Sequence, residues 1–284
     1  MPCFVRQALE TARQVSADPA VHEQIIREVL DWVSRIDLEQ SPPHMAQQIH
    51  RRLREITGNN DPYRPAKEHQ NRMALSLVPE LRAKIEASPD PLVVAVRLAI
   101  AGNVIDMGVN GKISTEQLQA SIHRAMTDPF VGDHQGVRQA MTAARRILFL
   151  ADNAGEIVLD RLLVEALGPD RVTVAVRGAP IINDATLFDA QAAGLVDITA
   201  VMDNGSDAPG TLLDDCSDAF KQRFFDSDLI IAKGQGNFET LSDAPYPIIF
   251  LFQAKCPVIA EHAQVPLGSH VWTWFQPATF SQKA

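Results

Sequence analysis

The chain has 284 residues, of which 46% are hydrophobic, and a formal net charge of −9 at pH 7. This length holds one large domain or two ordinary ones, and the acidic balance argues against a nucleic-acid binder that depends on phosphate contacts. No apolar run reaches the ~20 residues that span a bilayer, and residues 1–6 carry no basic segment followed by an apolar stretch, so we expect no membrane partner and no secretory signal.

The first half of the chain, to about residue 143, carries the three-to-four-residue apolar spacing of amphipathic helices. Segments rich in proline and glycine separate these helices, and Pro79 inside the longest one predicts a kink or a split. We therefore expect an all-helical N-terminal region, residues 1–143, that covers a cleft. The predicted helices are Phe4–Val15, Val21–Val33, His44–Thr57, Tyr63–Ala87, Leu92–Met107 and Thr115–Ala125.

From about residue 144 the pattern changes, because short β-branched runs alternate with segments of helix length. Such alternation indicates βαβ units and a parallel sheet. The predicted fold class is therefore α/β, with a mainly parallel Rossmann-like sheet flanked by helices, and we expect residues 144–284 to form this α/β domain. The predicted strands are Arg146–Ala151, Val172–Val176, Asp197–Met202, Leu229–Ala232, Ile248–Phe252 and Val271–Phe275.

The first strand of this half ends abruptly in Asp152-Asn153, and an amphipathic helix follows from Ile157. Ligands of open α/β sheets bind at the carboxyl ends of the strands, and carboxylate and amide oxygens suit a divalent cation. Backbone N–H groups near Gly155 and Glu156 are placed to meet an anion at the helix start. The simpler alternative is that Asp152 and Asn153 only cap the helix.

Two further strand ends repeat this arrangement of polar residues. The second strand leads into a loop with Asn183-Asp184, and the fourth leads into Lys233, Gly234 and Gly236. The carboxyl ends of parallel strands lie on one edge of the sheet, so these side chains are expected to converge there. The small residues after Lys233 would let a phosphate approach the backbone, whereas the alternative is an ordinary surface lysine.

Candidate substrate-binding residues also come from the helices. Asn103 and Asp106 are a polar pair in an otherwise apolar helix, and buried polar groups need partners, so we expect them to line the cleft. Lys67 and Asn71 lie one helical turn apart and either reach the cleft or form an ordinary solvated face. Two more candidates follow the strand ends: Glu156, which is otherwise merely favourable at a helix start, and Asn237.

These motifs resemble the prokaryotic branch of the metal-dependent damage-control phosphatases, a family long labelled domain of unknown function 89. The resemblance rests on residues 152–156, 183–186 and 233–237, with support from segments 61–63, 101–106 and 205–211. It implies that Asp152, Asn153 and Asp184 are the metal ligands and that Lys233 holds the substrate phosphate. It also implies sugar phosphates, phosphopantetheine-like compounds or damaged metabolites as substrates.

That branch often opens with a Cys-x-x-Cys pair, of which this chain has only Cys3. The sequence therefore gives no support for a metal or redox role built on that pair. The three cysteines are an odd and sparse set, which favours a reducing cytoplasm over a disulfide framework.

The predicted function is hydrolysis of small phosphomonoesters with the help of a divalent metal. Because the expected ligands are oxygen atoms, this metal is expected to be Mn²⁺, Mg²⁺ or another first-row ion. Asp152 would ligate the metal and orient the attacking water, although the sequence also allows direct attack by its carboxylate. One alternative is a nucleotide- or S-adenosylmethionine-binding transferase, which lacks support because no Gly-x-Gly loop follows the first strand. Another is a non-catalytic metabolite-binding protein. The sequence does not determine the oligomeric state.

Overall fold

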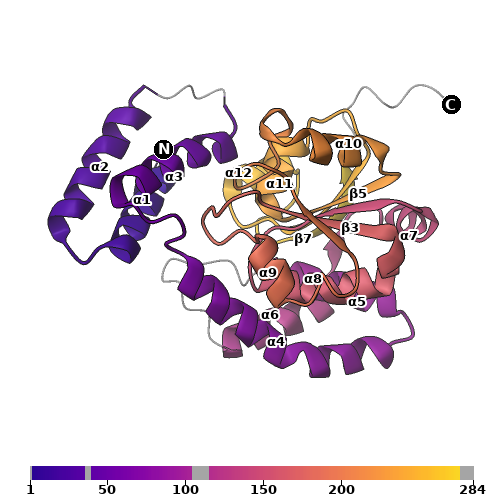
Figure 1. Ribbon diagram of the computed structural model, residues 1–284. Helices are drawn as coiled ribbons and strands as arrows, with labels where there is room; N and C mark the ends of the chain where they lie inside the picture. The colour runs from indigo at the N-terminus through magenta and orange to yellow at the C-terminus, as the bar shows by residue number, and fades with distance from the viewer. Residues whose placement is uncertain (1, 36–39, 104–114, 276–284) are drawn as a thin grey trace.

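The protein is described by a computed structural model that covers residues 2–35, 40–103 and 115–275. Its centre is a seven-stranded sheet with the strand order β1-β7-β6-β5-β2-β3-β4 (Figure 1). Every neighbouring pair is parallel except β6 and β7, which are antiparallel. The strands are β1 (Phe130–Val131), β2 (Ile147–Leu150), β3 (Val172–Val176), β4 (Ala200–Asp203), β5 (Leu229–Lys233), β6 (Ile248–Gln253) and β7 (His270–Phe275).

Helices precede and connect these strands. Before the sheet come α1 (Pro2–Val15), α2 (Pro19–Val33), α3 (Pro42–Thr57), α4 (Arg64–Glu86), α5 (Pro91–Gly102) and α6 (Thr115–Thr127). Within it lie α7 (His134–Ala143), α8 (Glu156–Leu167), α9 (Leu187–Ala192), α10 (Asp218–Asp226), α11 (Gly234–Leu241) and α12 (Pro257–His262), with single turns of 3₁₀ helix at Pro169–Arg171 and Leu213–Asp215.

The sheet is buried on both faces, which explains why its central strands read as continuous apolar runs. Alternate residues of β2 enter different clusters: Phe149 packs with α5 and α8, whereas Leu148 packs with Phe220 of α10 and Phe238 of α11. The sheet therefore lies between two helical layers, with β2 and β5 side by side at its centre. This places the ends of β2, β3 and β5 next to one another.

The N-terminal helices divide into two groups. Helices α1–α3 have a hydrophobic cluster of their own, which includes Ile25 and Ile49. Helices α4 and α5 instead share the cluster of α8 and the sheet, and in Figure 1 they lie below the sheet while α1–α3 lie beside it. The predicted boundary at residue 143 stays a prediction, and the packing shows a closer union of α4 and α5 with the sheet than of α1–α3.

Polar contacts attach α3 to the loop that follows β4. Asp207 of this loop accepts hydrogen bonds from Gln47 Nε2 at 2.7 Å and Arg51 Nε at 2.9 Å. Arg54 also pairs with Asp207, and its Nη1 donates to the Pro180 carbonyl at 2.9 Å. The contact of α3 with the loops near the strand ends is thus largely ionic.

The α/β fold with a mostly parallel sheet is confirmed, and three details differ from the sequence-based expectation. β1 lies inside the region expected to be all helical, because a two-residue strand is too short to show a period and forms only by pairing with β7. Helix α4 continues through Pro79, so the expected split does not occur. The side chain of Pro79 is exposed. β4 begins at Ala200, three residues later than expected.

The expected helix over Leu92–Met107 is described only to Asn103, so its last turn lies outside the described residues. Within the described ranges, no helix is long and apolar enough to cross a membrane.

Candidate active site

Backbone hydrogen bonds bring the first two motifs together at the edge of the sheet. The loop after β3 turns back, and the amide of Ala185 donates to the carbonyl of Asp152 at 2.7 Å. The amide of Ala154 donates to the carbonyl of Asn183 at 2.8 Å, and Asn153 and Asp184 face each other in an isolated antiparallel bridge. The convergence of the two motifs is therefore fixed by main-chain pairing, independently of their side chains.

The carboxylate of Asp152 is held by two amides. Its Oδ2 accepts hydrogen bonds from Nδ2 of Asn153 at 2.7 Å and from Nδ2 of Asn103 at 3.2 Å. Behind it lies Gly234, whose φ is +75° and where a Cβ would come within 1.8 Å of Asp152 Oδ2. Glycine is required here because the conformation is left-handed and because the carboxylate occupies the side-chain position.

Asp184 and Asp152 meet on the same buried cation, the guanidinium of Arg177. Nε of Arg177 donates to Asp184 Oδ2 at 2.7 Å, and its Nη2 lies 3.6 Å from Asp152 Oδ1. The sequence reasoning missed Arg177 as a site residue, although its position gives a signal. It is the residue directly after β3, at the same strand-end position that singled out the other candidates.

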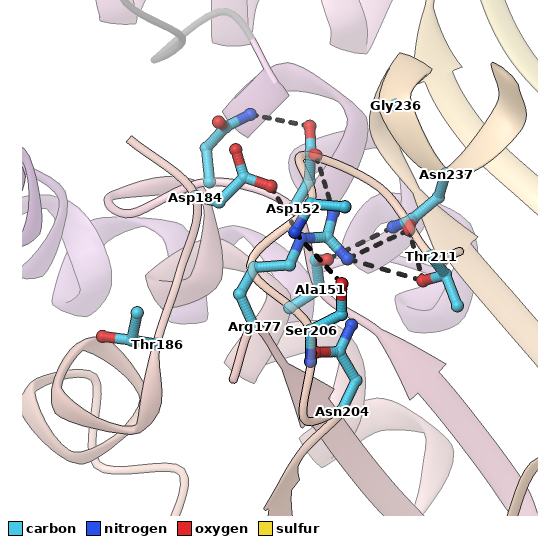
Figure 2. Close-up of polar contacts among 12 residues, drawn as sticks. Ala151, Asp152, Arg177, Asp184, Thr186, Asn204, Ser206, Thr211, Gly236 and Asn237 are labelled. Atoms are coloured by element: carbon cyan, nitrogen blue, oxygen red, sulfur yellow. Dashed lines mark hydrogen bonds and ion pairs between the residues drawn. The ribbon is translucent and has the colours of Figure 1, made fainter. Parts of the chain in front are cut away.

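The rest of the Arg177 side chain is anchored from the opposite side (Figure 2). Its Nη1 donates to Oδ1 of Asn237 at 3.2 Å and lies 3.4 Å from the hydroxyl of Thr211. Nη2 has no hydrogen-bond partner among the described residues, although Arg177 is only 2% exposed. The guanidinium is thus held firmly at one nitrogen and incompletely satisfied at another.

The ammonium of Lys233 contacts protein groups, whereas the family resemblance implied a contact with the substrate phosphate. Its Nζ donates to Glu156 Oε1 at 2.7 Å, to the Ala99 carbonyl at 2.9 Å and to Asp160 Oδ1. These three acceptors use all three hydrogens of the ammonium. Because Lys233, Glu156 and Asp160 are 1% exposed or less, the group forms a sealed layer beneath the strand ends, and Asp160 is a second residue that the sequence reasoning missed.

The charges of this sealed group shift two pKa values. Burial raises the pKa of Asp160 to about 7; Lys233 opposes the rise and Glu156 adds to it. Burial would lower the pKa of Lys233, but the carboxylates of Asp160 and Glu156 outweigh it, so the pKa is raised. One ammonium therefore faces one carboxylate more than it can neutralise, which is consistent with the raised pKa of Asp160.

Helix α4 supports the first motif from the other side. Oδ1 of Asn71 accepts a hydrogen bond from the amide of Gly155 at 2.6 Å, and its Nδ2 donates to Asp189 at 2.9 Å. Lys67 is 1% exposed and lies 3.3 Å from carboxylate oxygens of Asp189 and Asp61. The Gly155 amide, expected to meet an anion, is thus already engaged by Asn71.

Seven of the ten expected site residues are linked by side-chain contacts around Asp152, Arg177 and Glu156. Asn71 joins them through the Gly155 amide, and Lys67 shares Asp189 with Asn71. The tenth, Asp106, lies outside the described residues. Asn103 joins Asp152 to Glu156, whose Oε2 accepts its Nδ2 at 3.1 Å. Asn237 donates to the carbonyls of Lys233 and Ala151 at 2.8 and 3.2 Å. The polar atoms of these residues hold the strand ends together.

The chemistry of Asp152, Asn153 and Asp184 fits a divalent cation. The two carboxylates already meet a positively charged group, and the Nδ2 of Asn153 donates to Asp152 and Glu156, which leaves its amide oxygen as a ligand. Oxygen ligands of this kind suit Mg²⁺ or Mn²⁺. In the described parts of the chain, no group of three or more His, Cys, Asp and Glu side chains is placed to hold a metal. The expected metal ligands do not form such a group, because they are two carboxylates, Asp152 and Asp184, and the amide of Asn153.

The fold and the site define an α/β protein with acidic and amide side chains gathered at the carboxyl edge of a parallel sheet. The chain belongs to the damage-control phosphatase ARMT1-like family, because the family described as "Damage-control phosphatase ARMT1-like domain" matches residues 1–271. The resemblance predicted from the motifs is thereby confirmed.

Relatives and a solved structure agree with this assignment. A protein named damage-control phosphatase from Archaeoglobus fulgidus is 34% identical over 277 residues, which cover 95% of each chain. Damage-control phosphatase PH1575 from Pyrococcus horikoshii is 36% identical over 224 residues, covering 77% of this chain and 76% of the relative. The crystal structure of the DUF89 family protein PH1575 matches with a TM-score of 0.87 and 29% identity over 97% of both chains.

Proposed function

We propose that this protein is a divalent-metal-dependent phosphatase that hydrolyses small phosphorylated metabolites in the cytoplasm. Family membership supports phosphatase chemistry. The observation that carries the metal site is that Asp152 and Asp184, from different strand ends, meet one buried cation at 3.6 and 2.7 Å. A position that attracts a guanidinium between two carboxylates also suits a metal ion.

In this proposal Asp152, Asn153 and Asp184 would hold the metal, which would supply positive charge next to the substrate and make a water molecule more acidic. Asp152 has its carboxylate fixed by Asn103 and Asn153, so it orients the attacking water and accepts its proton. The positive charge of Arg177 adds to the stabilisation of the anionic transition state. No atom of the protein needs to form a covalent bond with the substrate.

The roles of the remaining expected residues follow from their partners. Substrate contacts by Lys233, Glu156, Asn237, Asn103, Lys67 and Asn71 stay predictions. The hydrogen bonds of these residues favour positioning roles, because their polar atoms meet carbonyls, carboxylates and amides of the strand-end loops.

The test is phosphate release from a panel of phosphorylated sugars, nucleotides and cofactor precursors by metal-stripped protein. We expect no turnover without metal, turnover with Mn²⁺ or Mg²⁺, and its loss on addition of a chelator. Asp184→Asn should reduce kcat/KM by more than about 100-fold, the upper limit for residues that only support a metal ligand. The exposed Asp243→Asn is the matched control and should behave as the wild type.

Turnover that persists in chelator would contradict the metal dependence. No phosphate release across the panel with several metals would favour a metabolite-binding protein. Thermal stabilisation by nucleotides or S-adenosylmethionine, without stabilisation by metal, would favour a transferase.

A further inference from the structure

Arg177 occupies the position where the proposed function places a metal ion. It is 2% exposed, and its guanidinium lies between the carboxylates of Asp152 and Asp184. The following inference rests on the proposed function. We propose that Arg177 is the internal counter-cation of Asp152 and Asp184 in the metal-free protein, and that a divalent cation binds by displacing its guanidinium from Asp184.

The need for a counter-cation follows from the burial of the two carboxylates. Asp152 is 8% exposed and Asp184 is 4% exposed, and two like charges close together in a poorly hydrated site are unfavourable without compensation. Arg177 provides that compensation, so the folded protein does not depend on metal to bring the strand ends together. Its presence also means that an arriving metal competes with a charge that is already there.

The contacts of Arg177 allow this exchange. Nη1 is anchored by Asn237 and Thr211, whereas Nη2 has no hydrogen-bond partner in the described part of the chain. If the bond from Nε to Asp184 is lost, the side chain can pivot about Nη1 and remain in the site. The amide of Gly178 donates to the carbonyl of Ser206 at 2.8 Å, which keeps the backbone next to Arg177 in place.

The exchange changes the charge of the site. The two carboxylates and Arg177 together carry one net negative charge, and a divalent cation converts this to one net positive charge. A guanidinium released from Asp184 would have its fork of donors available, and such a fork suits a phosphoryl group. Within this group of three side chains, the exchange thus changes the net charge from one that disfavours a phosphate to one that favours it.

A purely supporting role for Arg177 predicts the opposite effect on metal affinity. If its bond to Asp184 only orients a metal ligand, then removing Arg177 should weaken metal binding, as removal of supporting residues generally does. If Arg177 competes with the metal, then removing it should strengthen metal binding. The sign of the change therefore separates the two roles.

The experiment measures Mn²⁺ binding by isothermal titration calorimetry, without substrate. Arg177→Met should bind Mn²⁺ at least about tenfold more tightly than the wild type, the lower end of the effect of one nearby charge on an ionic equilibrium. Arg177→Lys, which keeps the charge, should stay closer to the wild type. The charge-matched control is Arg146→Met, which removes an exposed arginine before β2, at the opposite end of that strand, and should leave the affinity unchanged.

Unchanged or weaker binding by Arg177→Met would overturn the inference. If that variant does not fold, exchange of the wild-type Arg177 Nε–H, assigned by comparison with Arg177→Lys, provides the second measurement. Saturating Mg²⁺ should speed this exchange, because the bond to Asp184 is lost, and an unchanged rate would overturn the inference. Absence of metal binding by both wild type and Arg177→Met would also overturn it, whereas phosphate release decides the proposed function separately.

Discussion

Two groups of charged side chains near the strand ends have the same balance of charges but different surroundings. In each, one cation lies between two carboxylates: Arg177 with Asp152 and Asp184, and Lys233 with Glu156 and Asp160. The lysine group is 1% exposed or less throughout and uses every hydrogen of its ammonium. The arginine group lies at the edge of the sheet and leaves Nη2 without a hydrogen-bond partner among the described residues.

This difference indicates that the lysine group supports the fold, whereas the arginine group can take part in ligand binding. A sealed ion pair that loses a partner leaves a charge buried without compensation, so its members cannot exchange ligands. A guanidinium at the sheet edge, with one nitrogen unsatisfied, can give up one carboxylate and keep its other contacts. We therefore expect substitutions in the lysine group to act on stability and those in the arginine group to act on ligand binding.

The largest expected effect comes from Lys233→Met. The substitution leaves Glu156 and Asp160 without their cation, and removal of one partner of a buried pair destabilises a protein by about 3–5 kcal/mol. Chemical unfolding of the metal-free protein at neutral pH measures this loss. Lys221→Met removes a half-buried lysine whose ammonium contacts only the Asp214 carbonyl in the hydrogen bonds of the described residues, and it is the control.

This variant also tests the phosphate-binding role expected for Lys233 from the family. Such a role predicts a raised KM and a nearly unchanged free energy of unfolding. That result would break the proposed contrast between the two groups.

An intermediate effect is expected from Gly234→Ala, which lies between the two groups. An alanine at φ +75° adopts a left-handed conformation, and its Cβ would come within 1.8 Å of Asp152 Oδ2. Gly58→Ala is the matched control, because its φ is +64° and nothing lies within 4 Å of its Cβ. Both should lose roughly 1–2 kcal/mol of stability from the backbone conformation, but only Gly234→Ala should also weaken Mn²⁺ binding. Equal metal affinities would show that Asp152 does not need its observed position.

The last expected effect is a change in pH dependence caused by Asp160→Asn. The pKa of Asp160 rises from 3.8 to about 7 on folding, with burial as the main cause. A group that binds its proton more tightly when folded contributes stability below its unfolded pKa, and this contribution is lost as the pH rises through the folded pKa. The wild type should therefore lose more stability than Asp160→Asn between about pH 5 and pH 8.

Urea unfolding of metal-free protein at the two pH values tests this expectation, with the exposed Asp243→Asn as the control. Parallel pH profiles for the wild type and Asp160→Asn would mean that Asp160 stays ionised beside Lys233.

Much of the fold and of the site could be predicted from the sequence. The apolar runs in the predicted strands Arg146–Ala151 and Leu229–Ala232 indicate buried parallel strands, and the structure has β2 and β5 there, buried throughout. The position of Asp152 directly after one predicted strand, and of Asp184 in the loop after the next, predicts their convergence. β1 could not be predicted, because its pairing with β7 joins segments about 140 residues apart and leaves no local period.

The sequence alone determined which residue types stand at the strand ends, because strand length and the following turn are set by local apolar runs and glycines. Only the tertiary structure decided their partners. Arg177 and Lys233 are both cations at strand ends, yet one meets Asp152 and Asp184 and the other meets Glu156 and Asp160. The side on which a strand-end side chain emerges depends on how the sheet and the helices pack, and burial then determines whether its charge is sealed or available to a ligand.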